Sequence, residues 1–244
     1  MSVRITLATA ARVLQQLRRD RRTVALVIVV PPLLLTLFRY MFGRQQETFD
    51  RVGAPLVGIF PLVTMFLITS IAMLRERTTG TLERLMSMPL AKADLLLGYG
   101  LAYALVAALQ ATITSATAFG LLGLDVEGEV WLVVLFAIAN ALLGVALGLF
   151  FSAFAQTEFQ AVQFMPAVIL PQILLCGLIV PRERMARLLE IFSDFLPMTY
   201  AFEALEKATA GETGGRLALD ATVVIGSVVV ALLLGATTLR RRTP

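Results

Sequence analysis

Residues 75–94, RERTTGTLERLMSMPLAKAD, form a short charged segment between two long apolar stretches. Residues 53–74 before it contain no charged side chain, and neither do residues 95–124 after it. Each stretch has the roughly 20 apolar residues that a helix needs to cross the hydrocarbon core of a bilayer. The pattern predicts two membrane-spanning helices joined by a compact polar segment that emerges on one side of the membrane.

The composition of the whole chain agrees with a membrane environment. Hydrophobic residues make up 58% of the 244 residues and charged residues only 16%, with a mean hydropathy of +0.82. Soluble domains carry about 25% charged residues, so we expect an all-α integral membrane protein, a single transmembrane domain over residues 1–244. Histidine is absent and the one cysteine, Cys176, lies in an apolar run. An intrachain disulfide is therefore excluded, and a catalytic or metal site, as in an intramembrane enzyme, is not expected.

Six apolar segments are long enough to be spans. Residues 1–22 precede the first one and place apolar side chains at helical spacing among arginines, which predicts an amphipathic helix in the headgroup layer. Pro166 and Pro171 are expected to interrupt the fifth span. Gly144 and Gly148 should let a neighbouring helix approach the fourth. The predicted spans are residues 23–42, 52–74, 94–122, 130–155, 161–180 and 217–239.

The basic residues predict the orientation of these spans. Six arginines precede Thr23, four basic residues lie in residues 75–94, and three arginines stand near the C-terminus. The positive-inside rule then places both termini and residues 75–94 in the cytoplasm, with residues 181–216 outside. Because these charges are divided among separate membrane-flanking segments, nucleic acid is not an expected partner.

Residues 75–94 should contain a helix of their own. Thr79-Gly80-Thr81 is a start signal and Pro89 a stop, so about eight residues fit between them. Leu82, Leu85 and Met86 would share one face of this helix. That face could dock in a groove of another protein or bury itself in lipid, and the spacing alone leaves both interpretations open.

Residues 76–90, ERTTGTLERLMSMPL, resemble the E…GT-x-E-x-L…P-L signature of ABC exporter permeases of the second type. That family includes daunorubicin-resistance and polysaccharide or lipid exporters. The opening LRRD, followed by PPLLL and FG, and the later CGLIVP and FLPMTYAFEAL, also resemble the family's pattern in the correct order. Departures are Arg21 in place of a proline, Cys176 in place of a serine, and a missing proline–tryptophan pair near Met185.

The resemblance implies a permease subunit of an ATP-driven exporter in the cytoplasmic membrane of a bacterium. Two six-span subunits, forming a homo- or heterodimer, would move a drug, lipid or glycan, driven by two copies of a cytoplasmic ATP-binding subunit. ATP and Mg²⁺ would be bound by that partner and no cofactor by this chain, which lacks a G-x-x-x-x-G-K-[ST] motif. A stand-alone secondary transporter or channel is the alternative. It predicts buried ionisable residues or an inverted repeat, and neither is visible, although the broken fifth span leaves room for it.

The resemblance also implies roles for particular residues. The segment between the second and third spans would be the coupling helix, the second and fifth spans would line the route, and the helices after the fifth span would form an outer gate. An alternative for the route residues is plain helix packing, and Gln110 and Asn140 are expected to bond between helices. The candidates are Glu76, Gly80, Thr81, Glu83, Arg84, Leu85 and Pro89 for coupling to the ATPase; Met65, Phe66, Phe164, Met165 and Gln172 for the route; and Pro181, Phe195, Pro197 and Tyr200 for the gate.

Overall fold

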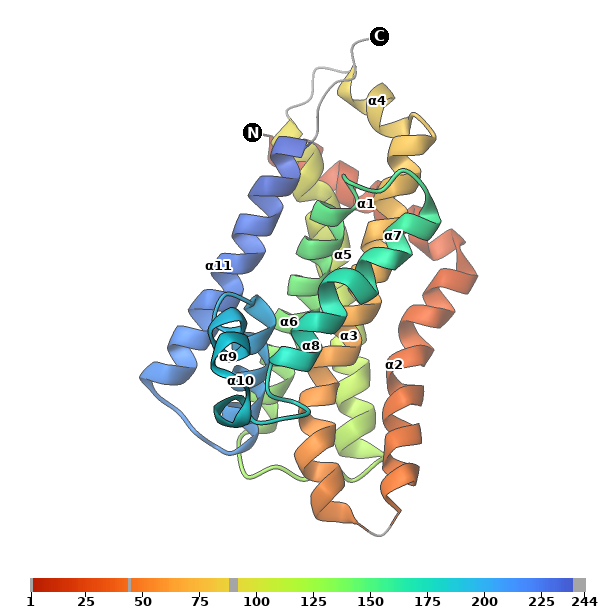
Figure 1. Ribbon diagram of the computed structural model, residues 1–244. Coiled ribbons are helices and arrows are strands. Elements are labelled where there is room, and N and C mark those ends of the chain that lie inside the picture. Colours follow the sequence, from red (N-terminus) through yellow and green to blue (C-terminus); the bar gives the residue numbers. More distant parts are fainter. Residues whose placement is uncertain (1, 44, 88–91, 239–244) are drawn as a thin grey trace.

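The computed structural model describes residues 2–43, 45–87 and 92–238, and every regular element in this part of the chain is a helix. Six helices are long and apolar enough to cross a membrane, which confirms the predicted all-α, six-span class (Figure 1). They are α2 (Arg21–Phe42), α3 (Gln46–Thr78), α5 (Lys92–Gly120), α6 (Val130–Phe151), the broken helix α7 (Glu158–Phe164), η1 (Met165–Ile169) and α8 (Leu170–Leu175), and α11 (Gly215–Thr238). The shorter elements are α1 (Val3–Arg19), α4 (Thr81–Met86), η2 (Arg182–Arg184), α9 (Arg187–Ser193) and α10 (Pro197–Thr209).

Helices α3 and α6 form the centre of the bundle, and each is more buried than any other span. Their close approach depends on the two glycines of α6, Gly144 and Gly148. A Cβ atom at Gly144 would collide with the backbone of Leu62, and one at Gly148 would lie 2.6 Å from the carbonyl oxygen of Phe66. The small residues predicted to allow close packing therefore do so, against α3.

The fifth span is interrupted where its prolines predict. Residues 165–169 adopt a π-helix that contains Pro166 and ends just before Pro171. Proline lacks the amide hydrogen that an α-helix needs, and the wider π turn accommodates the lost bonds. One side of this broken helix packs on α3, while the other, which includes Val162, Leu170 and Leu174, is exposed.

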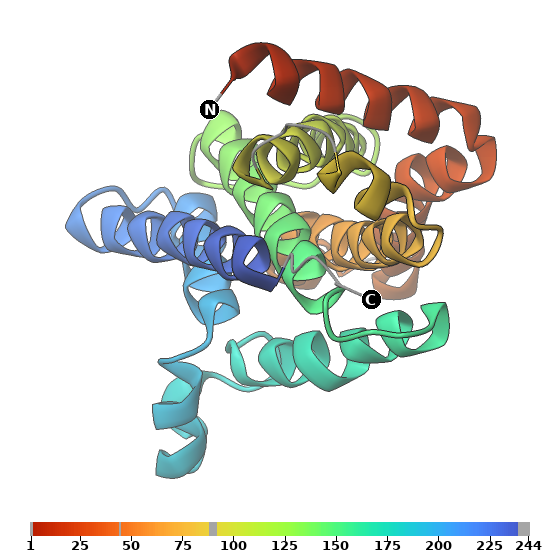
Figure 2. The same ribbon diagram turned by 90° about the horizontal axis from the view of Figure 1, so that it is seen from above.

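Helix α1 falls within the predicted N-terminal segment, residues 1–22, and lies crosswise over one end of the bundle (Figure 2). Thr9, Ala10 and Val13 are buried, and α1 packs chiefly on α5. At Gly98 of α5 the two backbones come so close that a Cβ atom would lie 2.9 Å from the Thr6 carbonyl oxygen. Helix α4 projects from the same end of the bundle (Figure 1).

Helix α10 lies in the other half of the molecule, packed against α3, α6 and α11. Its buried face includes Met198, Phe202 and Leu205. Gly58 of α3 makes room for this contact, since a Cβ atom there would collide with the side chain of Leu205. The amide of Gly128, between α5 and α6, donates to the Thr209 carbonyl at 3.0 Å. This helix is therefore part of the bundle.

Several helices begin or end at residues other than the approximate limits predicted for the spans. The second span, expected at residues 52–74, continues at both ends to Gln46 and Thr78, because Phe49 is fully buried and Gln46 bonds to Asp50 within the helix. The fourth, expected to reach residue 155, ends at Phe151. The fifth, expected at 161–180, begins at Glu158 and ends at Leu175. Gly177 follows with φ +106°, which is a left-handed conformation that breaks a helix.

Candidate functional site

Helix α4 follows α3 after a tight two-residue turn. Gly80, part of the predicted start signal, has φ +71°, a conformation that costs other residues strain, so it forms the turn. The Thr79 hydroxyl donates to the Arg75 carbonyl at 2.7 Å, and the Arg84 amide donates to the Gly80 carbonyl at 3.0 Å. Thr81 begins the helix. The first bond closes the end of α3 and the second belongs to the first turn of α4, while the hydroxyls of Thr79 and Thr81, 3.1 Å apart, bridge the turn between them.

The faces of α4 differ from the predicted apolar ridge. Leu82 is only 4% exposed and packs into the chain's own core, so it is not available to a partner. Leu85 is half-buried, whereas Arg84 and Ser87 are exposed. The helix has six residues instead of about eight. The side chains of Glu83 and Met86 and the predicted stop Pro89 lie outside the described residues.

Glu76, another coupling candidate, points into the molecule. Its Oε1 atom lies 3.3 Å from Nη1 of Arg12 on α1, and the Glu76 side chain is 11% exposed. The Arg12 guanidinium also donates to the Tyr99 hydroxyl of α5 and lies 5.5 Å from the centre of that ring. At the other end of α1, the Ser2 amide donates to both carboxylate oxygens of Asp94 on α5, each at 3.1 Å.

We call these two contacts, Arg12 with Glu76 and Ser2 with Asp94, the clasp. It ties the N-terminal helix to the helix before α4 and to the helix after it. Sequence reasoning missed the clasp, because its partners lie 64 and 92 residues apart and no local pattern pairs them. A third contact at this end joins Arg75 of α3 to Glu158 of α7 through two hydrogen bonds, 2.6 and 3.1 Å long.

The route candidates lie in different surroundings. Met65 and Phe66 are fully buried in the core of this subunit, so they line no open surface in this conformation. Phe164 and Met165 are half-buried, and the Phe164 ring lies 5.6 Å from that of Phe151. Gln172 is 6% exposed. It lies at an apolar cleft of about 460 Å³ between α6, the fifth span and α11.

Three polar side chains inside the bundle differ in their hydrogen bonds. Gln110 donates to the Val27 carbonyl of α2 at 2.9 Å, and Asn140 donates to the Ala201 carbonyl of α10 at 3.4 Å. Both bond between helices, as predicted. Gln172 instead donates to the Val168 carbonyl of its own span at 3.1 Å. The buried amide oxygens of all three side chains have no hydrogen-bond partner among the described residues.

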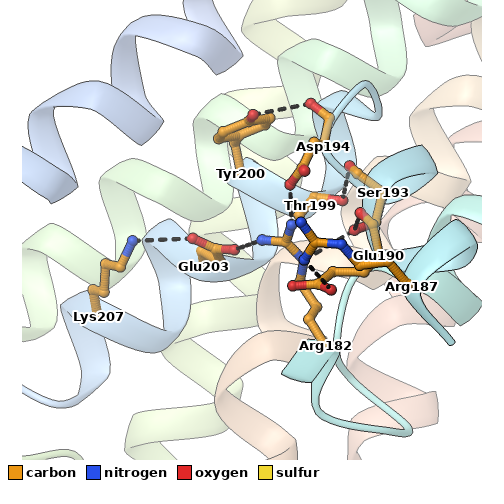
Figure 3. A network of polar contacts seen from close by, with 9 residues as sticks. All are labelled: Arg182, Arg187, Glu190, Ser193, Asp194, Thr199, Tyr200, Glu203 and Lys207. Carbon is orange, nitrogen blue, oxygen red and sulfur yellow. Dashed lines mark hydrogen bonds and ion pairs between the residues drawn. The ribbon is translucent and has the colours of Figure 1, made fainter. Parts of the chain in front are cut away.

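A network of charged groups lies near α10, and Tyr200 is the gate candidate that takes part in it (Figure 3). Arg182 of η2 forms ion pairs with Asp194 and Glu203 and donates to the Ser193 hydroxyl at 2.9 Å. The Tyr200 hydroxyl donates to the Asp194 carbonyl at 2.9 Å. The sequence did not single out Arg182, because residues 181–216 contain both acidic and basic side chains and one arginine among them is not distinctive.

The network continues to α11. Lys207 lies 3.1 Å from Glu203 and 2.6 Å from Asp220, which is almost fully buried. Burial alone would lower the pKa of Lys207, but its hydrogen bonds to Asp220 and Glu203 raise it, so the ammonium stays charged. A cavity of about 570 Å³ lies beside these groups, and Pro181 and Tyr200 line it. Pro197 begins α10, whereas Phe195 is 80% exposed and lies apart from the cavity.

Six helices long and apolar enough to cross a membrane, with the buried pair α3 and α6 at their centre, define a multi-pass membrane protein. A family model described as ABC-2 type transporter matches residues 5–209. The chain belongs to this family, which confirms the resemblance seen in the sequence. Because 205 of the 244 residues are matched, the assignment covers the first five spans, α4, α9 and α10.

Curated relatives agree with the family. The probable multidrug ABC transporter permease YbhS of Escherichia coli is 26% identical over 86% of this chain and 56% of its own length. The inner membrane transport permease YhhJ of the same organism is 28% identical over 62% of this chain and 41% of its own length. ABC transporter G family member 20 of Dictyostelium discoideum is 26% identical over 68% of this chain and 23% of its own length. The chain therefore spans about half or less of the length of these relatives.

Proposed function

We propose that this chain is the permease subunit of an ATP-driven exporter in the cytoplasmic membrane. A second permease subunit, identical or different, would complete the passage, and two separate ATP-binding subunits would bind ATP with Mg²⁺. The observation that carries the proposal is the position of α4. It stands between two spans at the end of the bundle that bears α1, with Arg84 and Ser87 exposed to a partner.

The contacts around α4 support a mechanical role. Because Leu82 is packed in the core and α4 follows α3 after only two residues, a displacement of α4 would be passed on to α3. The clasp would carry the same movement to α1 and α5. Since α3 also packs closely on α10 at Gly58, the displacement would reach the opposite half of the molecule, where the candidate gate lies.

The cleft at Gln172 supports a hydrophobic or amphiphilic cargo, such as a drug, lipid or glycolipid. Its wall is mostly apolar and includes Phe151 and Leu234. The unpartnered Gln172 Oε1 atom could accept a hydrogen bond from a polar group of the cargo. Met65 and Phe66 would take part in the route only if α3 and α6 separate during transport.

Labelling of introduced cysteines tests both the orientation of the chain in the membrane and the binding of an ATP-binding subunit at α4. Ser87→Cys lies on the exposed end of α4, and Glu212→Cys lies on the exposed connection between α10 and α11. The native Cys176 is buried, so it should react slowly. In intact cells a membrane-impermeant maleimide should label Glu212→Cys only. After permeabilisation it should label Ser87→Cys, and a co-expressed ATP-binding subunit should protect that position. Labelling of Ser87→Cys from outside would refute the proposed orientation.

Substitutions that change the charge of α4 test the coupling itself. Arg84→Glu or Leu85→Asp should reduce ATP-dependent transport by purified, reconstituted complex at least tenfold, while the subunit still inserts and folds. Glu212→Arg, an exposed charge reversal at the other end, is the matched control and should transport normally. Normal transport by both α4 variants, or transport by the lone chain without ATP, would contradict the proposal and favour a secondary transporter.

A further inference from the structure

The corner between α1 and α2 carries an unusual concentration of positive charge. The four arginines of residues 18–22 are exposed, and none forms an ion pair with another described residue. Asp20, the one acid among them, caps α2 by accepting hydrogen bonds from the amide and hydroxyl of Thr23, 3.2 and 2.6 Å long. These bonds lower the pKa of Asp20. Four arginines and one carboxylate therefore leave a net charge of +3 at neutral pH.

An open cleft of about 410 Å³ lies between α1, α2 and α3. Asp20 and Thr23 of the corner line it, while the four arginines are next to these residues in the sequence and do not line the cleft themselves. Its lining is amphiphilic. Asp20, Thr23 and Arg75 supply polar groups, and Leu26 and Ile68 are among its apolar residues. We call it the elbow cleft.

The polar and apolar groups of the elbow cleft lie at different depths. Helix α2 leaves the corner and α3 returns to it, so residue number measures depth along both helices. Thr23 and Arg75 are at the level of the corner, whereas Leu26 and Ile68 are deeper in the spans. Arg75 and Ile68 are seven residues apart, which is about 10 Å along a helix. The cleft is therefore polar at its mouth and apolar toward the middle of the membrane.

We propose that the elbow cleft binds one anionic glycerophospholipid of the bilayer, with an acyl chain between α2 and α3 and the phosphate at the corner arginines. Charge complementarity selects the headgroup, because clusters of arginine next to a transmembrane helix attract anionic lipids. Arg75 is engaged by Glu158, so the cations for the phosphate come from the corner. The inference is independent of the proposed function, since it requires neither ATP nor a partner subunit.

Lipid binding to the full-length purified chain tests this inference. Native mass spectrometry would follow titration with phosphatidylglycerol and with phosphatidylcholine of the same acyl chains. The double variant Arg21→Gln/Arg22→Gln should bind phosphatidylglycerol about 25-fold more weakly, at about fivefold for each arginine. The control Arg4→Gln/Arg184→Gln removes two exposed arginines elsewhere and should change affinity less than twofold. Equal affinity of the unmodified chain for both lipids would overturn the proposal.

A second variant separates a built site from a charged surface. Ala72→Phe fills the elbow cleft from α3 and leaves every charge in place. It should weaken binding of phosphatidylglycerol at least tenfold, with unchanged far-UV circular dichroism and elution volume. Unchanged lipid affinity in Ala72→Phe would show that the cleft holds no lipid. If Arg21→Gln/Arg22→Gln lost a co-expressed ATP-binding subunit but kept its lipid, the arginines would bind protein, and the proposal would fall.

Discussion

The Arg12–Glu76 contact of the clasp allows a quantitative test. Its side chains are 31% and 11% exposed, and Oε2 of Glu76 already lacks a hydrogen-bond partner among the described residues. Removing one member of a buried ion pair costs about 3–5 kcal/mol, because the other charge stays buried. Arg12 is partly hydrated, so we expect about 2–3 kcal/mol of lost unfolding free energy for Arg12→Met. The lost bond to Tyr99 is included in that figure.

A double-mutant cycle isolates the contact itself. Glu76→Gln should cost about 1–2 kcal/mol, and the double variant should cost less than the sum of the two by about 1–2 kcal/mol. Arg187 and Glu190 of α9 are the matched control. They form an ion pair of the same residue types at 3.0 Å, but Arg187 is 80% exposed, and exposed pairs contribute at most about 1 kcal/mol.

Unfolding in mixed detergent and SDS micelles, followed through the fluorescence of the single tryptophan, Trp131, measures these free energies. If Arg12→Met cost less than about 0.5 kcal/mol, or if the two single variants were additive, the clasp would not hold α1 to α3. In a reconstituted exporter, the same variants should also raise the ATP consumed per transported molecule. That outcome would link the clasp to coupling as well as to stability.

Two further predictions concern the opposite half of the bundle and its centre. Gly144→Ala should cost about 2 kcal/mol or more, because its methyl group meets the Leu62 backbone, as in other overpacked cores; Gly226→Ala, which meets nothing within 4 Å, should be neutral or slightly stabilising, and equal melting temperatures would contradict this. The ammonium of Lys207 has a raised pKa through Asp220 and Glu203, so its contribution to stability is fully present below the ordinary lysine pKa of about 10.4 and is lost as pH rises through the folded value. Unfolding free energy measured from pH 7 to 11 should therefore fall only at the alkaline end, and Lys207→Met should make this alkaline fall smaller while lowering stability at pH 7.

The sequence alone predicted the membrane-spanning helices of this protein, and the reason is physical. A bilayer demands long apolar helices with internally bonded backbones, so six spans, the broken fifth span and the small-residue face of α6 are visible in composition and spacing. The signature at residues 76–90 identified the family. The helix start at Thr79-Gly80-Thr81 was readable too, because its cause is local to these residues.

Tertiary structure decided which side of each helix faces a neighbour. Leu82 was expected on an outward face, but it is buried, since the direction of a six-residue helix depends on the surface of α3 against which it packs. The ion pairs of Glu76 and Arg182 and the elbow cleft are formed by residues far apart in the chain. Spacing within a helix records which residues share a face, while the identity of what covers that face is set only when the helices pack.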